Sequence, residues 1–403
     1  MKGKFILMLS VLVSLGWQAQ VKVLFDATKA EMAGNADWVI DADAHNLSVT
    51  STGITTNGTE SNPQRIPTPA QSGITAATSE TYWQGALSNW GIDLVRQGYM
   101  VETLPYNGNI TYGNSSNPQD LSNYKVFIVV EPNIRFSDSE KTAMLNFVAN
   151  GGGLFMVSDH TVSDRNNDGW DSPAIWNDFF TSNSVANNPF GISFNLNNVS
   201  PVSSNFAPVS FNPTILAGPQ GTPSQMKFSS GATMTLNKSN NPSAQGLIFT
   251  TGSSTTGSTN VMFATSTYGN GRICALGDSS VPDDGTGDPN DTLYNGYIGD
   301  ANGNHRPLLV NAVVWLAASS SLGIHEPVTK QKAAVYPNPA KDYVYVENTQ
   351  FKTYKILDEI GKTVGSGILP DNGIINVQNF PSGVYYLILL SDKDSQSTKL
   401  IKK

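Results

Sequence analysis

The chain has 403 residues, of which 39% are hydrophobic and only 14% are charged, and its formal net charge at pH 7 is −8. This length has room for two or three domains. The negative charge, with no lysine and arginine cluster in the central part, excludes nucleic-acid binding through neutralised phosphates, and a single cysteine, Cys274, excludes an intrachain disulfide.

The N-terminus has the pattern of an export signal. Lys2 and Lys4 precede an apolar run from Phe5 to Val13, and small or polar residues follow up to Ala19. This pattern is typical of a secretory signal peptide, here residues 1–19. The apolar run is too short to span a bilayer, and no later stretch approaches 18 apolar residues. We therefore expect a mature protein without a transmembrane segment.

Strand and helix patterns alternate through the next part of the chain. Short apolar strands are predicted at residues 21–26, 100–104, 126–130, 154–157 and 272–276, and helices at 79–97, 137–150, 174–180 and 307–317. Ser79 is the expected N-cap of the first helix, and Ser137 with Glu140 forms a capping box for the second. From 191 to about 259, short alternating segments indicate an inserted antiparallel β layer. The pattern predicts an α/β fold with a flavodoxin-like parallel sheet covered on both faces.

The order of these elements over residues 20–318 resembles the class I glutamine amidotransferase-like fold. The matching features are residues 23–26, 124–131, the helix that ends in the triple glycine 151–153, the strand and corner 154–160, and the last helix, 304–316. The resemblance implies the same sheet architecture for this core domain. The nucleophilic cysteine of that family has no counterpart here, because Ser158-Asp159-His160 stands at its strand end, so amidotransferase chemistry is not implied.

The last part of the chain has a different composition. Residues 319–332 read as a linker, and 333–403 as short alternating strands of an antiparallel β-sandwich. Its motifs are Tyr336-Pro337-Asn338-Pro339, Asp358–Lys362, Phe380–Tyr386 and the basic end Lys399–Lys403. This block resembles the sorting domain of the type IX secretion system of Bacteroidetes, which implies recognition by that machinery and a secreted or cell-surface protein. A substrate-binding module is the alternative.

Acidic residues and histidines gather at the predicted strand ends. In an open parallel sheet, functional residues lie beyond the carboxyl ends of the strands. The candidates for a shared catalytic pocket are Asp26, Glu131, Asp159, His160, Asp278 and His305. The loop after the first strand adds Asp37, Asp41, Asp43 and His45. Each residue by itself is also explained as a turn former or a hydrogen-bonded loop residue.

Two kinds of divalent cation fit this residue set. Imidazole and carboxylate ligands suit a catalytic zinc or similar ion that activates water. A structural calcium ion would suit the alternating residues of the loop 163–171, whose proposed ligands are Asp164, Asn166, Asp168 and Asp171. The twelfth position of that loop lacks the glutamate of an EF-hand, so a plain turn rich in Asp and Asn is the alternative. Asp300, Asn302 and Asn304 form a weaker cation motif.

These features favour a secreted hydrolase that acts on an extracellular substrate, for which polysaccharide or another polymer is a candidate. The nucleophile would be a metal-bound water or a water deprotonated by His160. Without a Gly-x-Ser-x-Gly elbow, a serine nucleophile is a minor option. Trp38, Trp83 and Trp170 would suit a polymer if they were exposed, whereas core packing is their other explanation. The alternative function is a non-catalytic, calcium-stabilised glycan-binding or adhesion protein.

Overall fold

The structure is a computed structural model that divides into two compact units, residues 1–320 and 321–403. The residues it describes are 20–33, 36–41, 47–50, 53–56, 71–79, 82–83, 85–285, 294–300, 305–318, 333–347, 351–358, 362–391 and 395–403. The expected signal peptide, linker, Asp43, His45, Asn302 and Asn304 lie outside the described residues.

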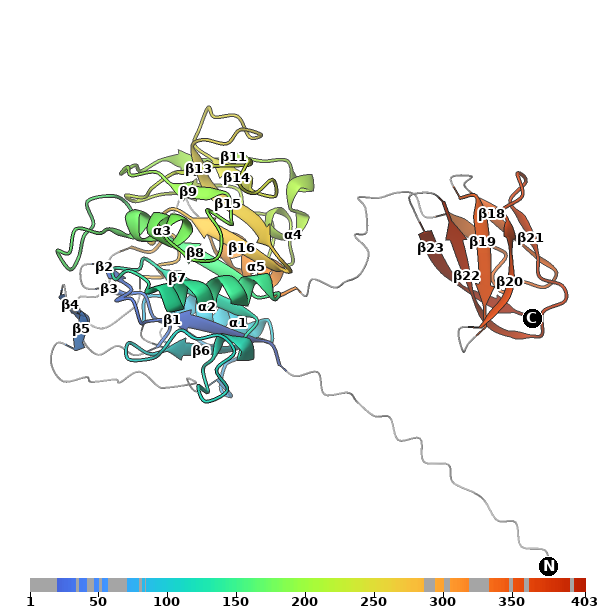
Figure 1. The fold of residues 1–403 in the computed structure, drawn as a ribbon, viewed down its shortest axis with the longest axis horizontal. Helices are drawn as coiled ribbons and strands as arrows, with labels where there is room; N and C mark the ends of the chain where they lie inside the picture. Colours follow the sequence, from blue (N-terminus) through green and yellow to red (C-terminus); the bar gives the residue numbers. More distant parts are fainter. Residues whose placement is uncertain are drawn as a thin grey trace, which may run out of the picture. The chain divides into compact units, whose positions relative to one another are not determined.

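The first unit is organised around one sheet whose parallel part has the flavodoxin-like strand order (Figure 1). Across the sheet the order is β6 (Met100–Leu104), β1 (Lys22–Asp26), β7 (Val126–Val130), β8 (Gly153–Val157) and β16 (Gly271–Leu276), and all adjacent pairs are parallel. The chain adds β6 on one side of β1 and the later strands on the other. The switch point therefore lies between β1 and β7, where such sheets bind ligands beyond the carboxyl ends of their strands.

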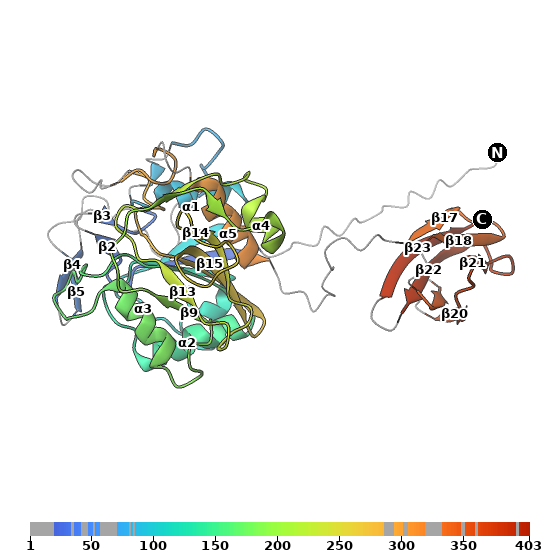
Figure 2. The same cartoon turned by 90° about the horizontal axis from the view of Figure 1, so that it is seen from above.

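The parallel strands are apolar because helices cover both faces of the sheet. Every residue of β7 and β8 is buried. Helices α1 (Ser88–Arg96) and α5 (Arg306–Ala317) lie on one face, and α2 (Asp138–Ala149) and α3 (Ser172–Thr181) lie on the other (Figure 2). An ion pair from Lys141 to Asp178, 2.6 Å long, joins α2 to α3. These layers confirm the expected α/β class.

Helix α1 is shorter than the sequence predicts. It begins at Ser88 rather than after Ser79, although Trp83, Leu87 and Trp90 are all buried as expected. The N–H groups of Ala86 and Leu87 donate to the carbonyls of Asp37 and Val39, at 3.3 and 3.0 Å, instead of to a preceding turn. Tertiary hydrogen bonds thus draw this segment out of the helix.

The other helices follow their sequence signals. Ser137 caps α2, and its capping box with Glu140 is present. Helix α3 begins two residues earlier than predicted because Asp171 is its N-cap, accepting the N–H of Ala174 at 3.2 Å. Local side-chain-to-backbone bonds of this kind are readable from sequence because both partners lie within one turn.

The inserted antiparallel strands continue the same sheet from the β16 edge. Strand β15 (Val261–Tyr268) pairs with β16, β14 (Gln245–Phe249) pairs with β15, and β11 (Asn205–Phe206) pairs with β14. Strand β13 (Met234–Leu236) joins β15 to β9 (Ile192–Phe194). The remaining elements of this unit are β2 (Met32–Ala33), β3 (Ala36–Asp37), β4 (Leu47–Thr50), β5 (Gly53–Thr56), η2 (Leu121–Asn123), β10 (Val202–Ser203), η3 (Val209–Phe211), α4 (Pro213–Leu216) and β12 (Met226–Lys227).

The second unit is the expected antiparallel β-sandwich. One sheet contains β17 (Ala334–Tyr336), β18 (Tyr343–Glu347) and β21 (Ile374–Asn376). The other contains β20 (Thr363–Ile368), β19 (Thr353–Leu357), β22 (Gly383–Leu390) and β23 (Ser395–Lys402). Alternate residues of these strands, Val344, Val346, Leu387 and Leu389 among them, point into a separate apolar core.

Candidate functional site

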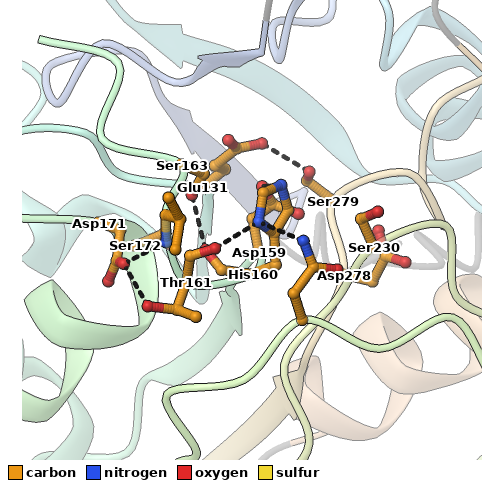
Figure 3. Close-up of polar contacts among 12 residues, drawn as sticks. Glu131, Asp159, His160, Thr161, Ser163, Asp171, Ser172, Ser230, Asp278 and Ser279 are labelled. Atoms are coloured by element: carbon orange, nitrogen blue, oxygen red, sulfur yellow. Dashed lines mark hydrogen bonds and ion pairs between the residues drawn. The ribbon is translucent and has the colours of Figure 1, made fainter.

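Glu131 lies at the carboxyl end of β7, beside the switch point, and is the centre of the site (Figure 3). Its backbone has a φ of +49°, a left-handed conformation that costs a non-glycine residue roughly 1–3 kcal/mol. The carboxylate is completely buried. Its Oε2 accepts hydrogen bonds from Trp38 Nε1 at 2.8 Å and Ser279 Oγ at 2.6 Å. Two segments far apart in sequence, those of Trp38 and Ser279, therefore hold one strained acidic residue in place.

Arg165 supplies the positive charge of the site. Its guanidinium contacts Glu131 Oε1 through Nε at 3.3 Å and Nη2 at 3.1 Å. Nη2 also lies 3.3 Å from Oδ2 of Asp159, which follows β8. One arginine thus bridges the acidic residues at the ends of two adjacent strands, and charge-assisted bonds of this kind fix their orientation.

The protonation of the neighbouring carboxyl groups is shifted by burial. Burial, together with the negative charges of Glu131 and Asp278, raises the pKa of Asp159 well above its usual value, against the opposing effect of Arg165. Burial raises the pKa of Asp278 to about 6, although hydrogen bonds from Ser280 and the Ser229 N–H oppose the shift. Asp159 therefore keeps its proton to a higher pH than an exposed aspartate does, as a general acid requires.

His160 is more exposed than Glu131, Asp159 and Asp278, with 18% of its side chain accessible. Its Nδ1 lies 2.6 Å from the carbonyl oxygen of Thr161. Nε2 lies 3.5 Å from Asp159 Oδ2. Asn198 Nδ2 lies 3.0 Å from Nδ1 on the other side. The imidazole and the Asp159 carboxyl group therefore face each other at contact distance.

The loop expected to bind calcium is built as a network of turns. The N–H groups of Asp168 and Gly169 donate to Asp164, and the N–H of Trp170 donates to Asp168. Asn166 donates from Nδ2 to the carbonyl of Asn133 at 2.9 Å. Besides capping α3, Asp171 accepts from Thr161 Oγ1 and the Val162 N–H, at 2.8 Å each. This network presents Arg165 to the site, and calcium in this loop stays a prediction.

The residues around Glu131 do not fit a bridging metal ion. Among the residues that the structure describes, no three His, Cys, Asp or Glu side chains are grouped as metal ligands. The position between Glu131 and Asp159, where a divalent cation would bridge two carboxylates, is taken by the Arg165 guanidinium. The chain itself therefore supplies the cation of this site.

Asp26, at the end of β1, belongs to a second acidic pair. Its Oδ1 accepts the N–H of Thr28 at 3.1 Å, and its side chain contacts Glu31. Burial raises the pKa of Asp26, and burial with the Asp26 charge raises the pKa of Glu31 well above its usual value. Each of these two carboxyl groups therefore keeps its proton to a higher pH than it would in water.

His305 has a structural role in this fold. Its Nδ1 donates to the carbonyl of Gly296 at 2.6 Å, and its Nε2 accepts the N–H of Lys227 at 3.0 Å. Burial lowers its pKa to about 4. Both ring nitrogens are thus engaged by backbone, which leaves neither for catalysis, and we exclude His305 from the candidate site.

Core packing is the explanation that holds for two of the three tryptophans. Trp38 and Trp83 are buried rather than exposed, and the Trp38 indole contacts Glu131 instead of solvent. Trp170 is half-buried beneath the Arg135 guanidinium, which lies 4.5 Å from its ring centre.

Sequence reasoning missed Arg165 as a site residue and Glu31 as the partner of Asp26. Arg165 lies inside the motif 163–171, whose acidic residues predict a calcium loop and draw no attention to the arginine between them. The signal that could have found it is charge balance, because carboxylates at neighbouring strand ends need a cation in the same loops.

Comparisons with known structures give only distant likenesses. The N-terminal domain of mmIFT52 is 14% identical, with a TM-score of 0.40, over 75% of this chain and 99% of that one. A cytoplasmic protein from Salmonella typhimurium is 11% identical, with a TM-score of 0.41, over 73% and 99%. A ThuA-like protein from Parabacteroides merdae is 13% identical, with a TM-score of 0.33, over 77% and 94%. All three TM-scores are too low to support a conclusion about this chain.

The C-terminal unit gives the informative comparison. No curated protein matches the chain. None of the helices in the described residues is long and apolar enough to cross a membrane. A family described as "Secretion system C-terminal sorting domain" matches residues 334–403. Residues 334–403 therefore carry a sorting domain of the type IX system, which directs this protein to the cell surface or the extracellular space.

Proposed function

We propose that the core domain, residues 20–318, is a secreted hydrolase whose site consists of Glu131, Asp159, His160 and Asp278. The observation that carries the proposal is the contact between the buried Asp159 carboxyl group, whose pKa is raised, and Nε2 of His160, 3.5 Å away. An acid and a base side by side at the carboxyl edge of a parallel sheet suit hydrolysis.

The proposed reaction uses both partners of this dyad. His160 Nε2 takes a proton from a water molecule, whose oxygen forms a bond to the electrophilic atom of the substrate. Asp159 gives its proton to the leaving-group oxygen as the bond to that oxygen breaks. The proton on His160 then passes to Asp159 across the 3.5 Å between them, which restores the starting state. Water is consumed and no metal takes part in these steps.

Glu131, Arg165 and Asp278 support this dyad in different ways. The charges of Glu131 and Asp278 keep Asp159 protonated, and Arg165 limits that effect while holding both acidic side chains. Ser279 donates to Glu131 rather than to His160, so it lacks the base that a serine nucleophile needs. Water is therefore the favoured nucleophile.

The first test is hydrolysis of chromogenic esters, phosphoesters and glycosides by the secreted protein. We expect at least one class to be hydrolysed, with the rate reduced about 10²–10⁴-fold in Asp159→Asn and in His160→Gln. Asp138→Asn, an exposed aspartate of α2, is the matched control and should retain full activity. Unchanged activity in both site variants would show that the site is misplaced.

The rival function is a calcium-stabilised glycan-binding or adhesion protein. Metal analysis before and after dialysis against EDTA separates the two. We expect hydrolysis to survive dialysis because Arg165 supplies the positive charge. Activity that is lost on dialysis and restored by zinc would replace our mechanism with a metal-assisted one. Bound calcium together with no hydrolysis of any substrate would favour the rival.

A further inference from the structure

A second concave surface lies away from the acidic site. It has a volume of about 290 Å³ and is formed by the start of α4, the strands β14 and β15, and Trp315 near the end of α5. We call it the Trp315 groove. Helix α4 lies beside α5 and the antiparallel strands in Figures 1 and 2.

The Trp315 groove lies at the edge of the sheet opposite the candidate catalytic site. The Trp315 carbonyl accepts a 2.5 Å hydrogen bond from Arg272, and Arg272 lies at the amino end of β16, paired with Thr267. Asp278, by contrast, follows the carboxyl end of the same strand. A ligand in the groove would therefore leave the catalytic edge free.

The lining of the groove combines aromatic rings with neutral hydrogen-bonding groups. Phe211 is 39% exposed and Trp315 is partly buried. Their neighbours in the lining include Thr214, Gln245 and Thr267. Within the described residues, the hydroxyl groups of Thr214 and Thr267 make no hydrogen bond of their own. They are therefore available to a ligand.

The groove has no charged side chain in its lining. Phosphorylated, nucleic-acid and carboxylate ligands are disfavoured, because no cation is present to neutralise them. A purely apolar ligand would leave the threonine hydroxyls and the Gln245 amide without partners, which costs free energy when they are covered. The lining thus selects a neutral ligand with apolar C–H faces and many hydroxyl groups.

Neutral sugars have this combination, since one face of a pyranose ring is C–H-rich and its rim carries hydroxyls. We propose that the Trp315 groove is a binding site for a neutral polysaccharide chain, with Phe211 and Trp315 as stacking surfaces. Arg272 lies 5.2 Å above the Trp315 ring and holds it in place without entering the groove lining. The volume, at the lower end of the range for small-molecule sites, limits the groove to a short stretch of the chain.

The proposal is tested by affinity electrophoresis of the full-length secreted protein in gels that contain soluble starch, xylan, mixed-linkage β-glucan, galactomannan or alginate. We expect retardation by at least one of the four neutral polymers and none by the anionic alginate. Phe211→Ala should weaken binding at least about 10-fold, because stacking on an exposed aromatic ring is lost. Thr267→Arg should abolish it, because a long charged side chain enters the groove.

Val209→Ala is the matched control, since Val209 is 46% exposed in the same short helix η3 but is absent from the lining. It should bind as the unmodified chain does, and Asp159→Asn should do so too, which separates this site from the proposed catalysis. Melting temperatures establish that each variant is folded. The proposal is overturned if no neutral polymer retards the protein, if alginate alone does, or if folded Phe211→Ala and Thr267→Arg proteins bind normally.

Discussion

The two units of the chain differ in how many charged side chains they bury. The core unit buries Glu131, Asp159 and Asp278 at a single sheet edge, with further buried carboxyl groups nearby. Among the described residues of the C-terminal unit, the only buried charged side chain is Lys402, with 9% exposure. Both units nevertheless have a continuous apolar core. The fold of the C-terminal unit therefore forms its core without buried acidic residues among the described positions.

This difference indicates which part of the molecule carries the function. Burying ionisable groups costs free energy that only specific partners offset, so a concentration of them at one edge indicates selection for chemistry rather than for folding. The C-terminal unit is a sorting domain for a secretion machinery, and its described residues bury no carboxyl group.

The largest expected effect is the loss of activity in Glu131→Gln. Removing this charge lowers the pKa of Asp159, which the Glu131 charge helps to raise, so the general acid holds its proton less tightly. We expect hydrolysis to fall about 10²–10⁴-fold. Glu347→Gln, at an exposed position of β18, is the control and should have no effect. Equal activity in the two variants would contradict the contrast between the units.

The next largest effect is on stability, and it should be confined to one unit. Phe155 is fully buried, with its ring edge-on to Trp90 at 5.3 Å, and Phe155→Ala should lower the free energy of unfolding of the core by about 3–5 kcal/mol. Leu387→Ala should lower that of the C-terminal unit by about 2–5 kcal/mol. Calorimetry should show two transitions, each shifted by its own substitution. A joint shift would mean that the units unfold together.

The pH dependence of stability should also differ between the units. Burial raises the pKa of Asp278 to about 6 and of Asp283 to about 7, above their unfolded value of 3.8. The native state therefore binds more protons than the unfolded state between pH 4 and 7, and its stability is lost as the pH rises through this window. His305, with its pKa lowered to about 4, opposes this below pH 6.5.

Because more carboxyl groups than histidines are shifted, we expect the melting temperature of the core to fall from pH 5 to pH 8. Asp283→Asn should flatten this slope. The described residues of the C-terminal unit bury no carboxyl group, so its transition should move little and serves as an internal reference. A core that becomes more stable towards pH 8 would contradict the burial argument.

The smallest effect concerns a helix end. Ser137→Ala removes the side-chain acceptor of the α2 capping box and should destabilise the core by about 1 kcal/mol. Ser137→Thr, which keeps the hydroxyl, should cost less. Denaturant unfolding measures both. Because α2 belongs to the first compact unit, the unfolding transition of the C-terminal unit should not respond.

The strand and helix order was predictable because its signals are local. β6 and β7 have the predicted bounds, and α2 has its predicted cap, since apolar runs and capping residues act within a few positions. The first helix begins later than predicted. The residues just before α1 donate hydrogen bonds to the carbonyls of Asp37 and Val39, about 50 residues earlier in the chain, and so do not join the helix. No local pattern contains that information.

The sequence by itself determined the export signal pattern, the sorting domain, the α/β class and the acidic ends of the strands, because each depends on short-range spacing. Only the tertiary structure decided which of those acids meet. It joined Glu131 to Arg165 and Asp159, paired Asp26 with Glu31, and engaged both ring nitrogens of His305 with backbone. Charge pairing and burial depend on distances across the fold, and sequence spacing does not encode those distances.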